Sequence, residues 1–231
     1  MGERLEELRT EPFAAEREWE VEGVPVLWAE ARVPRPVQAA DRAARRIKRF
    51  YQLQCRAFLR YCERCLLPQA AVEYRAAVEA SRPLPAFRAE LSYQVTYNQG
   101  GLWSLYTQSR ETAGPGRTLV TRRGDTWDLA AGYPVPLKDF FPAGASWKKR
   151  LLAQAAEDIQ RRERAGVARF HEDWRKKLRR FNPQNFYLTE EGLAFFYPMY
   201  AITPAAEGVP VFLLPYGEGA AGGWLDVPPP N

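Results

Sequence analysis

The chain has 231 residues, of which 46% are hydrophobic and 13% aromatic, with 33 basic and 28 acidic side chains and a formal net charge of +5. This composition is typical of an ordered globular protein that buries a core without disulfides or metals, and it excludes a disordered chain. No run of about eighteen apolar residues could span a bilayer, and the N-terminal residues lack the apolar stretch of a signal peptide. The sequence as given therefore predicts a soluble, cytoplasmic protein, or an extracellular one if a leader has been removed.

In the first part of the chain the spacing of the apolar residues changes once, from a strand pattern to a helix pattern. Residues 1–18 are acidic and predict a short helix or a frayed segment, and residues 19–36 alternate around a Gly-Val-Pro interruption, which is typical of two stretches of strand. From about residue 38 to residue 65 apolar side chains recur at steps of three and four, which predicts a long amphipathic helix. Pro68 interrupts this helix, and a few further turns follow before the prolines near residue 85.

A sheet is predicted after residue 86, where apolar and polar residues begin to alternate. Two alternating runs flank Asn98-Gln99-Gly100-Gly101, a tight hairpin turn, and a second turn at 113–117 leads into a third strand. These strands predict an antiparallel meander. The segment 125–142, "DTWDLAAGYPVPLKDFFP", reads as a junction between this meander and the next helix.

A second long helix is predicted from Ser146, a plausible N-cap, to Phe181. It carries the densest clusters of basic residues, at 147–150, 161–170 and 174–181. We interpret them as a solvated outer face rather than a surface for nucleic acid or an acidic partner. Two short strands around a Glu190-Glu191-Gly192 turn follow, then a last apolar strand at 208–216 and a Gly- and Pro-rich tail at 217–231.

The predicted fold class is therefore α+β, with an antiparallel β-sheet meander packed on one side by two long helices. We expect one domain over residues 19–216, made of an upstream strand and helix part at 19–85 and a sheet and helix part at 86–216. The acidic segment 1–18 and the tail lie outside it.

No catalytic constellation is apparent. Cys55, Cys62 and Cys65 could meet the only histidine, His171, in a zinc site if the two helices packed side by side, but buried free thiols are the expected outcome. The "GEGAAG" run at 217–222 lacks the strand and helix that a dinucleotide fingerprint requires. We expect a protein that is not an enzyme and that has no cofactor and no metal.

A binding role is predicted instead from aromatic side chains on or beside the strands, because one face of a sheet covered on one side stays exposed. The candidate binding residues are Trp103, Tyr106, Arg117, Trp127, Asp128, Tyr133, Asp139, Tyr197 and Tyr200.

The region from about Glu90 to Tyr216 resembles the RsiV-like domain of unknown function. The resemblance rests on "LSYQVTYNQGGLWSL", "WDLAAGYPVPLKDFFP" and "NFYLTEEGLAFFYPMYAITPAAEGVPVFLLPY" in this order, and "VPVLWAEARVPRP" looks like the segment found upstream in that family. Such domains form the extracellular part of an anti-sigma factor that recognises lysozyme and an accessory module ahead of a peptidoglycan deacetylase. This chain shows neither a membrane segment nor a catalytic domain, so neither signalling nor deacetylation transfers to it. "ETAGPGRTLVT" lacks the histidine that many relatives carry after the hairpin, so no role of that loop is carried over.

The favoured function is a non-enzymatic binding module for a protein or a cell-wall-type glycan. One alternative is a hydrolase on cell-wall glycan that uses carboxylates such as Asp128 and Asp139. Another is a binder of nucleic acid or of an acidic partner through the basic helix at 147–181.

Overall fold

The computed structural model describes residues 7–37, 41–84, 86–113 and 117–217, which form two compact units. Unit 2 comprises residues 9–93 and 107–120, and unit 1 comprises residues 7–8, 94–106 and 121–217 of the described chain. The strands β3 (Phe87–Gln99), β4 (Leu102–Ala113) and β5 (Thr118–Asp128) each have residues in both units.

Unit 2 begins with a hairpin of β1 (Thr10–Val21) and β2 (Val24–Pro36), joined at Glu22 and Gly23, which both have positive φ. The prediction of a helix or frayed segment over residues 1–18 is wrong from Thr10 onward, because these residues form an edge strand that pairs with β2. Residues 1–6 lie outside the described part. β2 pairs in parallel with β3, from Leu27 opposite Phe87 to Ala31 opposite Leu91.

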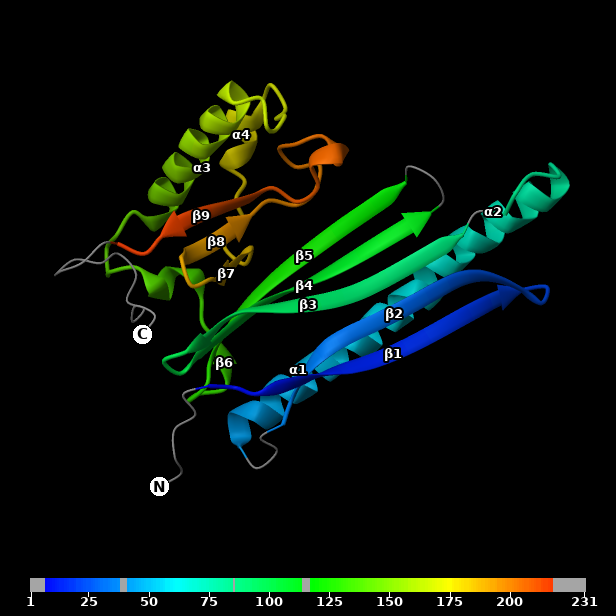
Figure 1. The fold of residues 1–231 in the computed structure, drawn as a ribbon, viewed down its shortest axis with the longest axis horizontal. Helices are drawn as coiled ribbons and strands as arrows, with labels where there is room; N and C mark the ends of the chain where they lie inside the picture. The colour runs from blue at the N-terminus through cyan, green and yellow to red at the C-terminus, as the bar shows by residue number, and fades with distance from the viewer. Residues whose placement is uncertain (1–6, 38–40, 85, 114–116, 218–231) are drawn as a thin grey trace. The chain divides into compact units, whose positions relative to one another are not determined.

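One run of helix follows β2 in unit 2. It consists of α1 (Arg42–Tyr61), a π-helical turn η1 (Cys62–Leu66) and α2 (Leu67–Glu79), and it packs on β2 (Figure 1). Asp41 caps α1 by accepting a hydrogen bond from the Ala44 N–H at 2.8 Å. Pro68 has no N–H and would crowd the carbonyl four residues earlier, which explains why the helix widens just before it and then continues.

Unit 1 contains the ends of β3 and β4, most of β5, and the two-residue strand β6 (Tyr133–Pro134) that pairs with β5. It also contains a separate antiparallel sheet of β7 (Phe186–Leu188), β8 (Gly192–Phe196) and β9 (Val211–Pro215). Short 3-10 turns, η2 (Leu137–Phe140) and η3 (Ala205–Glu207), lie in its connections. The remaining helices are α3 (Trp147–Arg164) and α4 (Trp174–Leu178).

Helix α3 packs on β9 in unit 1 (Figure 1). Arg162 of α3 donates to the Val211 carbonyl at 3.0 Å and lies 5.4 Å from the centre of the Phe212 ring, while the buried carboxylate of Asp158 pairs with both Arg161 and Arg162. The core beneath is rich in aromatic rings, with Phe195 packed on Phe181 and on Phe212. These contacts hold the three-stranded sheet to α3.

The predicted helix over residues 146–181 is wrong in its length. α3 ends at Arg164, because Gly166 takes a positive φ of 66° and the N–H groups of Gly166 and Val167 donate to the carbonyls of Glu163 and Arg162. This is the Schellman pattern that closes a helix. A loop then leads to the five-residue α4.

The α+β class is confirmed, and the hairpin at residues 98–101, the β7–β8 turn and the last strand lie where the sequence predicts them. The arrangement differs in detail from a meander covered by two long helices. One long helical run packs in unit 2, the shorter α3 packs on a second sheet in unit 1, and the larger sheet, of order β1-β2-β3-β4-β5-β6, contains a parallel pair. The second predicted turn, at 113–117, and the tail fall largely on residues outside the described part.

Candidate functional site

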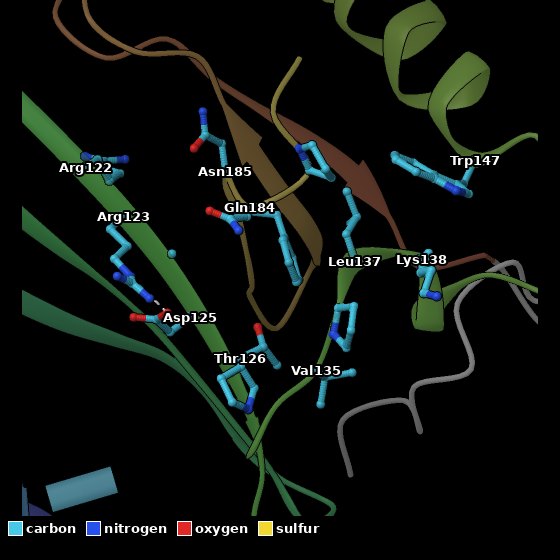
Figure 2. A pocket seen from close by; sticks show the side chains of 15 residues that line it. Arg122, Arg123, Asp125, Thr126, Val135, Leu137, Lys138, Trp147, Gln184 and Asn185 are labelled. Carbon is cyan, nitrogen blue, oxygen red and sulfur yellow. Dashed lines mark hydrogen bonds and ion pairs between the residues drawn. The ribbon is translucent and has the colours of Figure 1, made fainter. Parts of the chain in front are cut away.

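Unit 1 contains a hollow of about 500 Å³ beside β5, which we call the β5 hollow. Its walls come from β5, from the extended segment after β6, from the start of α3 and from the residues that lead into β7. Figure 2 shows Arg122 and Arg123 on one side, Leu137, Lys138 and Trp147 on the other, and Gln184 and Asn185 between them. The lining residues are Arg122, Arg123, Gly124, Asp125, Thr126, Pro134, Val135, Pro136, Leu137, Lys138, Trp147, Pro183, Gln184, Asn185 and Phe186.

Gly124 fixes the distance between β5 and β7 at the base of the hollow. A Cβ atom at this position would lie 1.8 Å from the carbonyl oxygen of Phe186 and 2.6 Å from its carbonyl carbon. No side chain fits in that space, so only glycine allows the two backbones to approach this closely. The close approach brings Phe186 and the residues just before it to the cationic part of β5.

A buried hydroxyl group supports the same wall. Ser104 of β4 accepts a hydrogen bond from the Leu188 N–H at 2.8 Å, and its Oγ lies 2.7 Å from the Thr126 hydroxyl and 3.3 Å from the Asp125 carbonyl. Ser104 is fully buried, so each of these bonds satisfies a polar group that water cannot reach. The strands β4, β5 and β7 are thus joined at one point behind the hollow.

Arg122 is held in place by two aromatic side chains. Its guanidinium lies 4.1 Å from the centre of the Tyr106 ring, and it donates to the Tyr187 hydroxyl at 3.4 Å. Burial raises the pKa of Tyr187, and the nearby Arg122 charge partly offsets that increase. Tyr187 therefore stays neutral at physiological pH, and its hydroxyl and the Tyr106 ring hold the Arg122 guanidinium at the wall of the hollow.

The hollow carries an excess of positive charge. Arg122, Arg123 and Lys138 line it, whereas the one carboxylate among the lining residues that the structure describes belongs to Asp125, which is buried and accepts from Arg123 Nε at 3.1 Å (Figure 2). Arg123 remains more than half exposed despite this pair. The remaining lining combines apolar groups with the amides of Gln184 and Asn185, a composition that suits an anionic ligand with an apolar face.

Trp147 lines a second hollow as well. This shallower depression of about 470 Å³ lies along the start of α3 and is also lined by Phe141, Pro142, Ala145, Ser146, Lys149, Arg150 and Ala153. The Trp147 ring is half-buried and lies 6.2 Å from that of Phe141. Because one tryptophan borders both depressions, an elongated ligand could cross its ring and occupy the two.

Several predicted binding residues lie in the core. Trp103, Trp127 and Tyr197 are each at most 3% exposed, and the Tyr197 hydroxyl donates to the Leu178 carbonyl at 2.8 Å. Burial strongly raises the pKa of Tyr197. Tyr106 is half-buried and does not line the hollow. Its ring packs against Arg122, and its hydroxyl donates to Gln94 Oε1 at 2.6 Å.

The predicted carboxylates do not gather in the hollow. Asp128 accepts from the Ala130 and Ala131 N–H groups at 2.7 and 3.1 Å, so it stabilises the turn after β5, and Asp139 is exposed on η2. Tyr133 is exposed on β6. None of the three lines the hollow.

The last two candidates lie on other surfaces. Arg117 of unit 2 pairs with Glu73 of α2 at 3.3 Å. Tyr200 of unit 1 is 48% exposed and has a positive φ of 68°, which is uncommon for a residue with a side chain.

The three cysteines that were predicted as buried free thiols or zinc ligands belong to unit 2. Cys55 and Cys62 are buried and Cys65 is exposed, whereas His171 belongs to unit 1. Burial raises the pKa of Cys62 to about 12, so this thiol is not a ready nucleophile or ligand. Within the described residues, no group of three or more His, Cys, Asp or Glu side chains is placed to hold a metal ion.

Sequence reasoning missed six of the residues that give the hollow its character. These are Arg122, Arg123, Lys138, Trp147, Gln184 and Asn185. The sequence offers one signal, and it concerns only the two arginines. They lie next to Gly124 in a strand, and an isolated glycine in a strand often marks a close backbone approach. The segment 125–142 does contribute, through Asp125, Thr126 and residues 134–138.

Comparisons with known proteins place this fold beside others of unassigned role. Residues 138–217 match a protein family described as "Protein of unknown function (DUF3298)". No curated protein matches the chain. A crystal structure of a member of the DUF3298 family from Bacteroides fragilis has 15% sequence identity and a TM-score of 0.65 and covers 92% of each chain. A DUF3298 family protein from Pseudomonas aeruginosa PAO1 has 17% identity and a TM-score of 0.54 over 90% of each chain. These structures share the fold of nearly the whole chain, beyond the matched segment.

Proposed function

We propose that this protein is a non-enzymatic binding module that holds an acidic glycan of the cell-wall type in the β5 hollow. The observation that carries the proposal is the hollow itself. It has a volume in the range of small-ligand sites, a wall with Arg122 and Arg123, and an opposite wall that carries apolar groups, Lys138 and Trp147 (Figure 2).

Three features of the lining favour a glycan. The half-buried Trp147 offers a flat surface for the apolar face of a sugar ring, and Gln184 and Asn185 offer donors and acceptors for hydroxyl groups. The second depression on the far side of Trp147 provides room for a chain of sugars rather than one. Arg123 and Lys138 would pair with carboxylates on that chain.

The residues at hand also favour binding without chemistry. Hydrolysis of a glycosidic bond ordinarily requires two carboxyl groups across the bond, whereas Asp125 is the one carboxylate among the described lining residues, and it is paired with Arg123. The Thr126 hydroxyl is hydrogen-bonded to Ser104. The resemblance to an RsiV-like domain, which occurs as an accessory module ahead of a peptidoglycan deacetylase, agrees with this choice of ligand.

Titration calorimetry with muropeptides and with a neutral chito-oligosaccharide tests the proposal. Trp147→Ala and Lys138→Ala should each weaken muropeptide binding by about tenfold, since each removes one direct contact worth about 1–2 kcal/mol. Trp19→Ala, at a half-buried tryptophan of unit 2, and Lys148→Ala, at an exposed lysine outside the lining, should leave the affinity unchanged.

The neutral oligosaccharide separates the contribution of charge. It should bind more weakly than the muropeptide, and Lys138→Ala should have no effect on it. Equal losses in the hollow variants and in their controls, or turnover of either sugar, would contradict the proposal.

A further inference from the structure

Helix α1 carries an unusual one-sided charge. Its twenty residues contain seven basic side chains and no acidic one. The basic residues are Arg42, Arg45, Arg46, Lys48, Arg49, Arg56 and Arg60. A solvated helix face normally mixes charges of both signs at spacings of three and four, which stabilises the helix. α1 lacks that mixture.

Five of these arginines form one line on the outside of unit 2, which we call the arginine stripe. It comprises Arg42, Arg45, Arg49, Arg56 and Arg60, all exposed, at steps of three, four, seven and four residues. At 1.5 Å per residue the stripe is about 27 Å long. The opposite face of α1 is buried, including Ala44, Ile47, Tyr51, Cys55 and Phe58, so the stripe points away from the core of its unit.

The stripe arginines are not neutralised within their own unit. In the part of the chain that the structure describes, no ion pair joins any of the five to a carboxylate. Arg42 and Arg45 also lie near the positive end of the helix dipole, where Asp41 caps the helix but the first turn itself has no acidic residue. Repulsion of this kind destabilises a helix, so an external anionic surface would relieve it.

We infer that the arginine stripe docks unit 2 on the surface of an anionic phospholipid bilayer. Five cations on one straight helix face can meet a flat layer of phosphate headgroups together. Each basic side chain near such a surface contributes about fivefold to the binding constant. In the middle of the stripe, Leu53 is 48% exposed and Ala57 is exposed beside it, and the interfacial region accepts such apolar groups.

The same residues argue against other polyanions. The stripe offers Leu53 at its centre where a nucleic-acid backbone would need another donor, and it presents no exposed aromatic ring between Arg42 and Arg60 on which a base could stack. Docking would be peripheral, because the apolar face of α1 is already buried and no helix in the described residues is long and apolar enough to cross a bilayer. The site is independent of the β5 hollow, which belongs to unit 1.

Flotation of the full chain with vesicles tests the inference. Vesicles of equal parts phosphatidylcholine and phosphatidylglycerol should bind the protein at low ionic strength, vesicles of phosphatidylcholine alone should not, and binding should fall steeply as salt screens the charges. The variant Arg45→Glu/Arg49→Glu/Arg56→Glu should lose on the order of a hundredfold in binding.

A charge-matched control separates the stripe from overall charge. Lys148→Glu/Arg179→Glu/Arg180→Glu changes three exposed residues of unit 1 and, like the stripe variant, takes the net charge from +5 by three reversals of two charges each to −1. It should retain most of the vesicle binding. An equal loss in both variants would overturn the inference.

Circular dichroism checks that the stripe variant is folded. If it is not, Arg49→Gln and Arg56→Gln take its place, each expected to weaken binding about fivefold. Two further results would overturn the inference: no loss in the Gln variants, or tighter binding to a short DNA duplex than to anionic vesicles.

Discussion

Gly124 has no side chain, and the packing of β5 on β7 depends on that absence. We expect Gly124→Ala to lower the free energy of unfolding by about 3 kcal/mol or more, because its Cβ would lie 1.8 Å from the backbone oxygen of Phe186 and backbone must move to admit it. Urea unfolding measures the loss.

A second glycine provides the control for this substitution. Gly166→Ala adds a Cβ where no atom lies within 4 Å. It should lower the free energy of unfolding by only about 1 kcal/mol, because residue 166 has a left-handed backbone conformation. Similar losses in the two variants would mean that the close approach at Gly124 is not what limits that position.

Glu111 of β4 is half-buried and accepts a hydrogen bond from the Tyr61 hydroxyl at 2.9 Å. Burial raises the pKa of Glu111 above its ordinary value of 4.5, and the bond from Tyr61 partly lowers it. A carboxyl group with a raised pKa in the folded state favours folding below its unfolded pKa, and this contribution is lost as pH rises through the folded pKa. Relative to the wild type, Glu111→Gln should therefore gain stability as pH increases from below 4.5 towards neutrality.

The hydrogen bond from Tyr61 to Glu111 allows a second test of this pH dependence. Tyr61→Phe removes the donor that lowers the pKa of Glu111, so the loss of stability should move to higher pH in that variant. Chemical unfolding at a series of pH values measures both effects. A difference between Glu111→Gln and wild type that is constant from pH 4 to 8 would contradict the prediction.

At the scale of the element, the charge of α1 should reduce the stability of the helix that carries it. Arg42→Glu places a negative charge at the first helical position and beside Arg45 and Arg46, so it should raise the free energy of unfolding by about 0.5–1 kcal/mol. Arg56→Glu lies far from the helix N-terminus and only relieves repulsion between like charges. It should therefore raise the free energy of unfolding by less than Arg42→Glu. Urea unfolding in low salt shows the two gains, and about 1 M salt should abolish most of both. A loss of stability in Arg42→Glu would show that the residue is neutralised in some other way.

Elements with a local signal were predictable from the sequence. Gly100 and Gly101 have the positive φ values that a tight hairpin needs, and the alternating runs on either side form β3 and β4 as expected. The break in the predicted 146–181 helix has a local signal too, since Gly166 follows the last turn of α3, but the amphipathic pattern around it concealed the stop.

Long-range pairings left no local signal. The parallel pairing of β2 with β3 joins strands that are separated by the whole α1–α2 run, and a helix between two strands does not by itself indicate which strands pair. The β5 hollow is harder still, because four separate segments between Arg122 and Phe186 supply its lining. The sequence therefore missed Trp147 in the lining, and it did not indicate that Trp103, Trp127 and Tyr197, which were predicted to bind a ligand, would be core.

At the scale of the whole molecule, a ligand of the β5 hollow should raise the melting temperature. A muropeptide at a hundred times its dissociation constant should stabilise the folded state by about 2.7 kcal/mol, which corresponds to about 5–10 °C for a chain of this size. The increase should be smaller for Trp147→Ala at the same concentration. If the two units melt separately in calorimetry, the transition of unit 1 alone should move, and movement of the unit 2 transition alone would place the ligand elsewhere.

The strands β3, β4 and β5 belong to both units, and this has a consequence for dissecting the protein. Each unit is assembled from separated stretches of the chain, with residues 94–106 of unit 1 interrupting the sequence of unit 2. No single proteolytic cut can therefore separate the two units, because a cut after residue 120 would leave residues 94–106 of unit 1 with unit 2. A truncation at residue 138, where the family match begins, would remove β4 and β5 from the unit that contains that match. During synthesis, unit 2 can be completed once residue 120 has left the ribosome, whereas unit 1 must wait for β9.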